Sequence, residues 1–90
     1  MADRTVTIVN ERGLHARAAA KFTALAEEFR SDIAVSNGRE EVGGRSIMGL
    51  LLLAAAKGTD ITVRTDGADA DAALAALCAL VEGGFGEDRD

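Results

Sequence analysis

The order of hydrophobic periods along the chain is the feature that most constrains its fold. Apolar residues two apart, such as Val6 and Ile8, are typical of a half-buried strand. Spacings of three and four, as in Phe22, Leu25 and Phe29, are typical of an amphipathic helix. With the turn residues between them, these periods predict strands at residues 4–9, 33–36, 41–42 and 61–65, and helices at residues 16–29, 46–56 and 70–82. Short strands joined by hairpins or single helices favour an antiparallel sheet with helices on one face.

This order indicates one α+β domain over residues 1–90, without repeats or linkers. An Asn-Gly pair at residues 37–38 is a strong hairpin signal between the second and third strands. Asp69 is expected to cap the last helix with its side chain, and the Gly-Gly pair at residues 83–84 to end that helix. We expect residues 85–90 to form a frayed acidic tail.

Charge is distributed unevenly along the chain. The net charge of the 90 residues is −5, which argues against nucleic acid as a main partner. Residues 1–57 carry eight basic and seven acidic side chains, whereas residues 58–90 carry two basic and eight acidic ones. Any chemistry that handles an anion is therefore expected in the first two thirds of the chain.

Composition also excludes several kinds of site. A single Cys forbids an internal disulfide, and no set of Cys and His residues indicates a metal site. The longest apolar stretch, residues 47–56, is half as long as the roughly 20 residues that a membrane-spanning helix needs. The first residues lack the apolar core of a secretory signal. We expect a cytoplasmic protein that needs no metal or cofactor and does not enter a membrane.

The most informative cluster is Gly-Leu-His-Ala-Arg at residues 13–17, where a turn meets the first helix. It contains no Ser, Thr, Asp or Asn, so we expect the first N–H groups of the helix to be uncapped and open to an anion. Arg17 adds a guanidinium suited to phosphate, and the imidazole of His15 is a nucleophile when neutral. These parts predict a phosphoryl-accepting histidine. The alternative is that His15 caps the helix or lies exposed while Arg17 is simply solvated.

A second cluster begins at Ser46. Its hydroxyl is placed to cap the following helix, and a phosphate there would also suit the helix dipole. The apolar residues after it are too many for a short helix to bury entirely, so an exposed patch for partners and a wholly buried role are both open. The residues concerned are Ile47, Met48, Leu51 and Leu52.

Three segments together resemble HPr, the histidine-containing phosphocarrier family of the bacterial phosphoenolpyruvate-dependent phosphotransferase system. They are residues 13–17, Ser-Asp-Ile at residues 31–33, and Arg-Ser-Ile-Met-Gly at residues 45–49. The resemblance runs from about residue 5 to residue 81, and its two main motifs are specific in order and spacing. It implies an open-faced β-sandwich, in which three helices cover one face of a four-stranded antiparallel sheet.

The resemblance also implies a function. His15 would accept a phosphoryl group at Nδ1 from enzyme I and pass it to an enzyme IIA domain, as a monomeric relay rather than a stand-alone enzyme. Arg17 and the backbone amides of Ala16 and Arg17 would hold the phosphate. Ser46 would be the site of an HPr kinase/phosphorylase. The surface that meets the partners would contain Arg12, Lys21, Arg45, Ile47, Met48 and Leu51.

Two positions depart from the usual family pattern. Ala18 stands where the family usually has Pro, and Gly43 where it usually has Asn. Ala18 regains an N–H that could face the phosphate. The sugar-uptake and nitrogen-regulatory branches share both motifs, so the sequence leaves the branch open. A different class of function is also open, a regulatory module whose partners respond to phosphorylation of Ser46.

Overall fold

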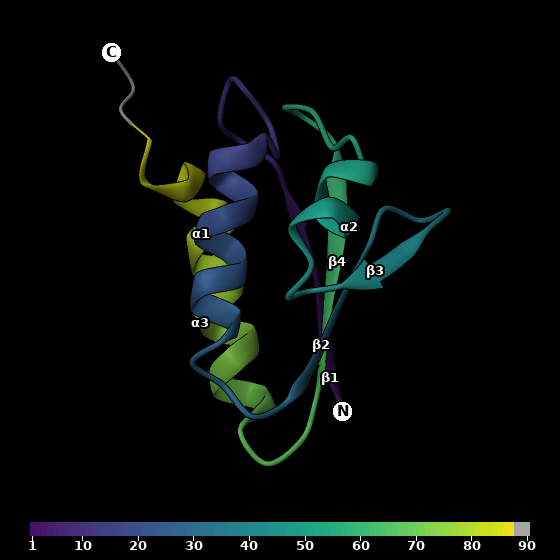
Figure 1. Cartoon of the computed structure of the whole chain (residues 1–90), viewed down its shortest axis with the longest axis vertical. Helices are drawn as coiled ribbons and strands as arrows, with labels where there is room; N and C mark the ends of the chain where they lie inside the picture. Colours follow the sequence, from purple (N-terminus) through teal and green to yellow (C-terminus); the bar gives the residue numbers. More distant parts are fainter. Residues whose placement is uncertain (88–90) are drawn as a thin grey trace.

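A computed structural model describes residues 1–87 of the chain. Its elements follow the predicted order, with one short 3-10 helix added at the end (Figure 1). They are β1 (Ala2–Thr7), α1 (Ala16–Ala26), β2 (Asp32–Ser36), β3 (Glu41–Gly43), α2 (Ile47–Leu52), β4 (Asp60–Asp66), α3 (Ala70–Glu82) and the 3-10 helix η1 (Gly84–Gly86). The observed first strand, β1, begins and ends two residues earlier than the predicted strand at residues 4–9.

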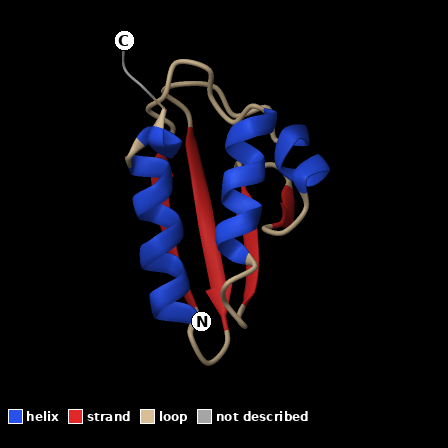
Figure 2. Ribbon diagram, turned by 60° about the vertical axis from the view of Figure 1, so that its left-hand side comes forward, coloured by secondary structure: helices blue, strands red, loops and turns tan. Residues whose placement is uncertain are grey.

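The strands form one antiparallel sheet in the order β1-β4-β2-β3. The period of two is preserved in β4, where Ile61, Val63 and Thr65 are buried while the residues between them are more exposed. Figure 2 shows the helices on one side of the strands, which leaves the other face of the sheet open. This is the open-faced α+β sandwich that the resemblance implies.

Aliphatic side chains and two phenylalanines fill the space between the sheet and the helices. Phe22 of α1 and Phe85 of η1 are the largest fully buried side chains. Small residues such as Ala18 and Ala19, both fully buried, let α1 lie close to its neighbours. The departure from Pro at position 18 therefore places a small side chain in the core at the first turn of α1.

Two predicted helices are shorter than their apolar patterns suggest. The first ends at Ala26, and Arg45 Nη2 closes the turns beyond it by donating to the carbonyls of Ala26, Phe29 and Ser31. The second ends at Leu52, because the backbone of Ala54 takes a left-handed conformation with φ of 51°. Phe29, Leu53 and Ala55, which extend the two patterns, still lie in or against the core, so in these cases periodicity reported burial rather than helix length.

The expectation that the Asp69 side chain caps α3 is wrong. Its carboxylate makes no cap hydrogen bond and instead accepts from the backbone N–H of Arg30, at 2.9 Å, and from the N–H and hydroxyl of Ser31. The hydrogen bond from the Ser31 hydroxyl is the main reason that the pKa of Asp69 lies below its usual value. Asp69 thus fastens the loop between α1 and β2 to the start of α3.

The expected frayed tail is wrong for residues 85–87. Phe85 is completely buried, and Glu87 contacts side chains near the start of α1. Figure 1 shows this C-terminal turn, in yellow, beside the upper end of α1. Residues 88–90 of the predicted tail lie outside the described residues.

Candidate functional site

The turn before α1 is fixed by contacts that present His15 at the start of the helix. Gly13 has φ of 68°, and a Cβ on it would lie 2.6 Å from the carbonyl oxygen of Ala55, so only glycine fits. The N–H of Leu14 donates to that same Ala55 carbonyl at 2.9 Å, and the Leu14 side chain is buried. The segment after α2 therefore fixes the turn that carries His15.

The imidazole of His15 itself caps α1. His15 is the N-cap residue, and its Nδ1 accepts from the backbone N–H of Arg17 at 3.2 Å. The expectation of an uncapped helix start is wrong, because a ring nitrogen accepts the hydrogen bond that a Ser or Asp oxygen usually accepts at this position. The capping contact that the sequence left open is therefore present, and it points Nδ1 at the helix N-terminus without excluding a phosphoryl-accepting role.

This contact determines where the ring proton lies. A backbone N–H can only donate, so Nδ1 must carry a lone pair, and the proton of the neutral ring is on Nε2. Nε2 faces Oε2 of Glu87 and is hydrogen-bonded to it. The His15 and Glu87 side chains are only 17% and 19% exposed, so water competes little for this bond. The ring is thus held at both nitrogens, with the nucleophilic lone pair on Nδ1.

Glu87 is held by a second donor. Nδ2 of Asn10 donates to Oε1 of Glu87 at 3.0 Å and to the carbonyl of Gly13 at 2.8 Å. The hydrogen bond from His15 is the main cause that keeps the pKa of Glu87 below its usual value; the hydrogen bond from Asn10 and the charge of Arg12 act in the same direction. Glu87 is therefore a carboxylate at neutral pH, with each oxygen engaged.

The segment that carries Glu87 is anchored on both sides. Phe85 lies in the core with φ of 60°, and Nζ of Lys21 donates to its carbonyl at 2.8 Å. Sequence reasoning missed Asn10, Phe85 and Glu87. The one available signal was an aromatic residue between two glycines in a tail otherwise rich in acidic residues, which is typical of an anchored turn.

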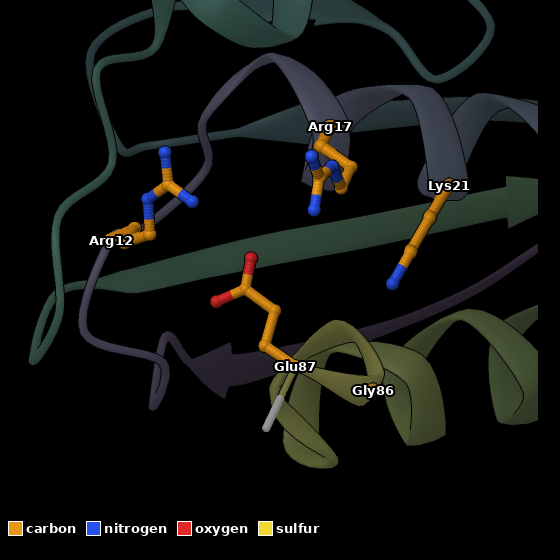
Figure 3. Close-up of a pocket in the computed structure, with 5 residues that line it drawn as sticks. All are labelled: Arg12, Arg17, Lys21, Gly86 and Glu87. Atoms are coloured by element: carbon orange, nitrogen blue, oxygen red, sulfur yellow. The ribbon is translucent and has the colours of Figure 1, made fainter. Parts of the chain in front are cut away.

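Basic side chains surround the Glu87 carboxylate. An open hollow of about 330 Å³ is lined by Arg12, Arg17, Lys21, Gly86 and Glu87. Figure 3 shows the carboxylate directed toward the space between Arg12 and Arg17, with Lys21 farther along α1. The structure thus brings the predicted residues Arg12, Arg17 and Lys21 together around one hollow, in a basic environment suited to an anion. Ala16 is exposed in the first turn of the same helix.

The second cluster lies at the start of α2. Oγ of Ser46 accepts from the N–H of Gly49 at 2.9 Å, so Ser46 is the predicted cap and its side chain is exposed. Exposed apolar side chains follow it: Ile47 is 41%, Met48 70% and Leu52 69% exposed. We call these three residues the α2 patch. Leu51 is half-buried against the core, and Arg45 is committed to three carbonyls at the end of α1.

Other kinds of site find no support in residues 1–87. No group of three or more His, Cys, Asp or Glu side chains in this range could hold a metal ion. None of its helices is long and apolar enough to cross a membrane.

Comparison with known proteins gives consistent matches over most of the chain. A family model described as "PTS HPr component phosphorylation site" matches residues 2–83. The phosphocarrier protein HPr of Neisseria meningitidis serogroup B is 51% identical over 87 residues, covering 97% of this chain and 98% of the relative. The phosphocarrier protein NPr of Shewanella violacea is 48% identical over 85 residues, covering 94% and 93%.

Solved structures agree with these matches. The crystal structure of HPr-C-His from Thermoanaerobacter tengcongensis has a TM-score of 0.92 and 39% identity, covering 98% of this chain and 99% of that one. An HPr dimer from the same organism has a TM-score of 0.76. The expectation that this chain is a monomer therefore stays a prediction.

Proposed function

The chain belongs to the HPr family, the phosphocarrier proteins of the phosphotransferase system, and on this premise we propose that His15 carries the phosphoryl group. In this proposal, Nδ1 of His15 accepts the group from phosphorylated enzyme I and passes it to an enzyme IIA domain. The observation that carries the proposal is the lone pair on Nδ1, held at the start of α1 by the N–H of Arg17.

Both transfer steps take place at this one nitrogen. The lone pair of Nδ1 attacks phosphorus, the bond between phosphorus and the donor's nitrogen breaks, and that electron pair returns to the donor. The His15 ring keeps its proton on Nε2 and becomes a phosphorylated imidazolium. In the onward step the acceptor attacks the same phosphorus, and the positively charged ring is a good leaving group. The chain itself is a relay and does not turn over a small molecule.

Groups near Nδ1 are suited to the charge of the phosphoryl group. The N–H of Arg17, which meets the lone pair before transfer, is next to the phosphoryl oxygens after it. The N–H of Ala16 and the Arg17 guanidinium would add donors at the same helix end. Arg12 and Lys21 line the adjoining hollow and contribute positive charge.

We assign docking of enzyme I and enzyme IIA to the α2 patch, together with the basic side chains Arg12 and Lys21. The patch is apolar and exposed, and α2 packs against α1, which carries His15. Leu52 replaces the half-buried Leu51 in this assignment. Arg45 is left out of it, because its guanidinium is engaged with backbone carbonyls.

Regulation at Ser46 is the second part of the proposal. An HPr kinase/phosphorylase would add about −1.5 to −2 charges at the edge of the α2 patch. The exposed hydroxyl at a helix N-terminus supports this, since a phosphate suits that end of the dipole. The added charge would weaken docking to an acidic partner surface and slow transfer. The relay is preferred over a purely regulatory module because His15 is already in the reactive tautomer. A cytoplasmic location stays a prediction.

The experiment is transfer of label from phosphoenolpyruvate. Incubation with labelled phosphoenolpyruvate and enzyme I should give one acid-labile phosphate per chain, absent from His15→Ala and retained in Ser46→Ala. Label that persists in His15→Ala would contradict the assignment. The second step is tested by adding an enzyme IIA, which should remove the label.

A further inference from the structure

We propose that Glu87 is a positioning residue that keeps the His15 ring proton on Nε2 and so keeps Nδ1 nucleophilic. Oε2 of Glu87 accepts from Nε2 of His15, across 72 residues of sequence. The functional meaning of this contact rests on the proposed phosphoryl transfer at Nδ1. The tautomer itself is a property of the unphosphorylated protein.

The network requires a carboxylate rather than an amide at position 87. The Gly13 carbonyl can only accept, so it fixes Asn10 with its NH2 group toward Gly13 and Glu87. The other atom of the amide, Oδ1 of Asn10, is buried and has no hydrogen-bond partner within residues 1–87. No contact on that side therefore favours the flipped orientation of the amide. Position 87 therefore meets two donors, Asn10 Nδ2 and His15 Nε2. Only a carboxylate offers an acceptor to each.

An amide at position 87 would reverse the ring. In Glu87→Gln the single amide oxygen is claimed by Asn10, and the amide NH2 is left facing Nε2 of His15. That geometry favours a lone pair on Nε2 and the proton on Nδ1, where it conflicts with the N–H of Arg17. Glu87→Gln should therefore be worse for the reactive tautomer than Glu87→Ala, which leaves Nε2 to water.

Charge gives Glu87 a second effect, on the phosphorylated form. The imidazolium formed on transfer keeps its proton on Nε2 and pairs with the Glu87 carboxylate, as an acidic residue pairs with a catalytic histidine. Arg12, Arg17 and Lys21 line the same hollow and offset the repulsion between the carboxylate and the phosphoryl group. Loss of the carboxylate should reduce the equilibrium yield of phosphorylated His15 by about three- to tenfold.

The test reads the tautomer from nitrogen NMR shifts of the His15 ring at about pH 9, where an ordinary imidazole is neutral. The wild-type chain should show the proton on Nε2. Glu87→Gln should shift the tautomer ratio toward Nδ1 by about tenfold, the size expected for one hydrogen bond. Glu82→Gln, which changes an exposed carboxylate ion-paired with Arg4, is the matched control and should leave the ratio unchanged.

A double variant sharpens the test. Asn10→Ala combined with Glu87→Gln frees the amide oxygen to turn toward Nε2, so the proton should return there. Equal ratios in wild type, Glu87→Gln and Glu87→Ala would overturn the proposal, and so would a double variant that resembles Glu87→Gln while both remain folded. Failure of phosphoryl transfer to His15 with a normal tautomer result would instead count against the proposed function alone.

Discussion

The starts of α1 and α2 are both capped by the side chain that carries the proposed chemistry, but the two caps are built differently. Ser46 caps α2 through one local bond to Gly49, three residues away, and its hydroxyl is otherwise exposed. His15 caps α1 locally through Nδ1, and its other nitrogen is held by Glu87 from the far end of the chain. A local cap suits a site open to modification, whereas the two-sided contact fixes the proton of a nucleophile.

Among variants that test the difference between the two caps, Phe85→Ala is expected to have the largest effect. The ring is fully buried and anchors the turn that carries Glu87, so its loss should cost about 3–5 kcal/mol of unfolding free energy. The loss is measured by urea unfolding at low temperature. It should be accompanied by the tautomer change expected for Glu87→Ala. The cap at Ser46 should be unaffected in the folded state, as read from the amide chemical shift of Gly49. An unchanged tautomer in a folded Phe85→Ala chain would show that the distant contact does not depend on this anchor.

A smaller effect is expected from Ser46→Ala. Removing the cap should lower the unfolding free energy by about 1 kcal/mol, because the N–H of Gly49 loses its acceptor. Ser46→Asp should lose less, since Asp also caps, and it should slow transfer to enzyme IIA if the added charge opposes docking. The His15 tautomer should be the same in both variants. A tautomer change in either would mean that the two helix starts are coupled.

The smallest effect is a pH dependence from Glu87. Because the pKa of Glu87 is lowered in the folded chain from its ordinary value of 4.5, the carboxylate stabilises the fold above that value. This contribution is lost as the pH falls through the lowered folded-state value. The difference in unfolding free energy between wild type and Glu87→Gln should therefore shrink as the pH falls below 4.5.

The control for that experiment is the same comparison in a His15→Ala background. His15 supplies the main hydrogen bond that lowers the pKa of Glu87, so most of the pH-dependent difference should disappear there. If the pH-dependent difference persists, the hydrogen bond from Asn10 and the charge of Arg12 are the main causes of the lowered pKa of Glu87.

Sequence alone determined the order of elements, the hairpin, the two clusters and the family, because each depends on residues close together in the chain. The spacing of Phe22, Leu25 and Phe29 reports which side of a segment is buried, and that spacing survives even where the helix stops at Ala26. The Ser46 cap was predictable for the same reason, since its donor lies within one turn.

Only the tertiary structure decided what lies against His15. The contact between Nε2 of His15 and Glu87 depends on burial of Phe85 in the core. This burial brings two residues that are 72 positions apart within hydrogen-bonding distance. Likewise, Asp69 was expected to cap its own helix, but the loop at Ser31 offered three donors and captured it. Local periodicity and capping patterns carry no information on such distant donors and acceptors, because these meet only after the sheet and helices have packed.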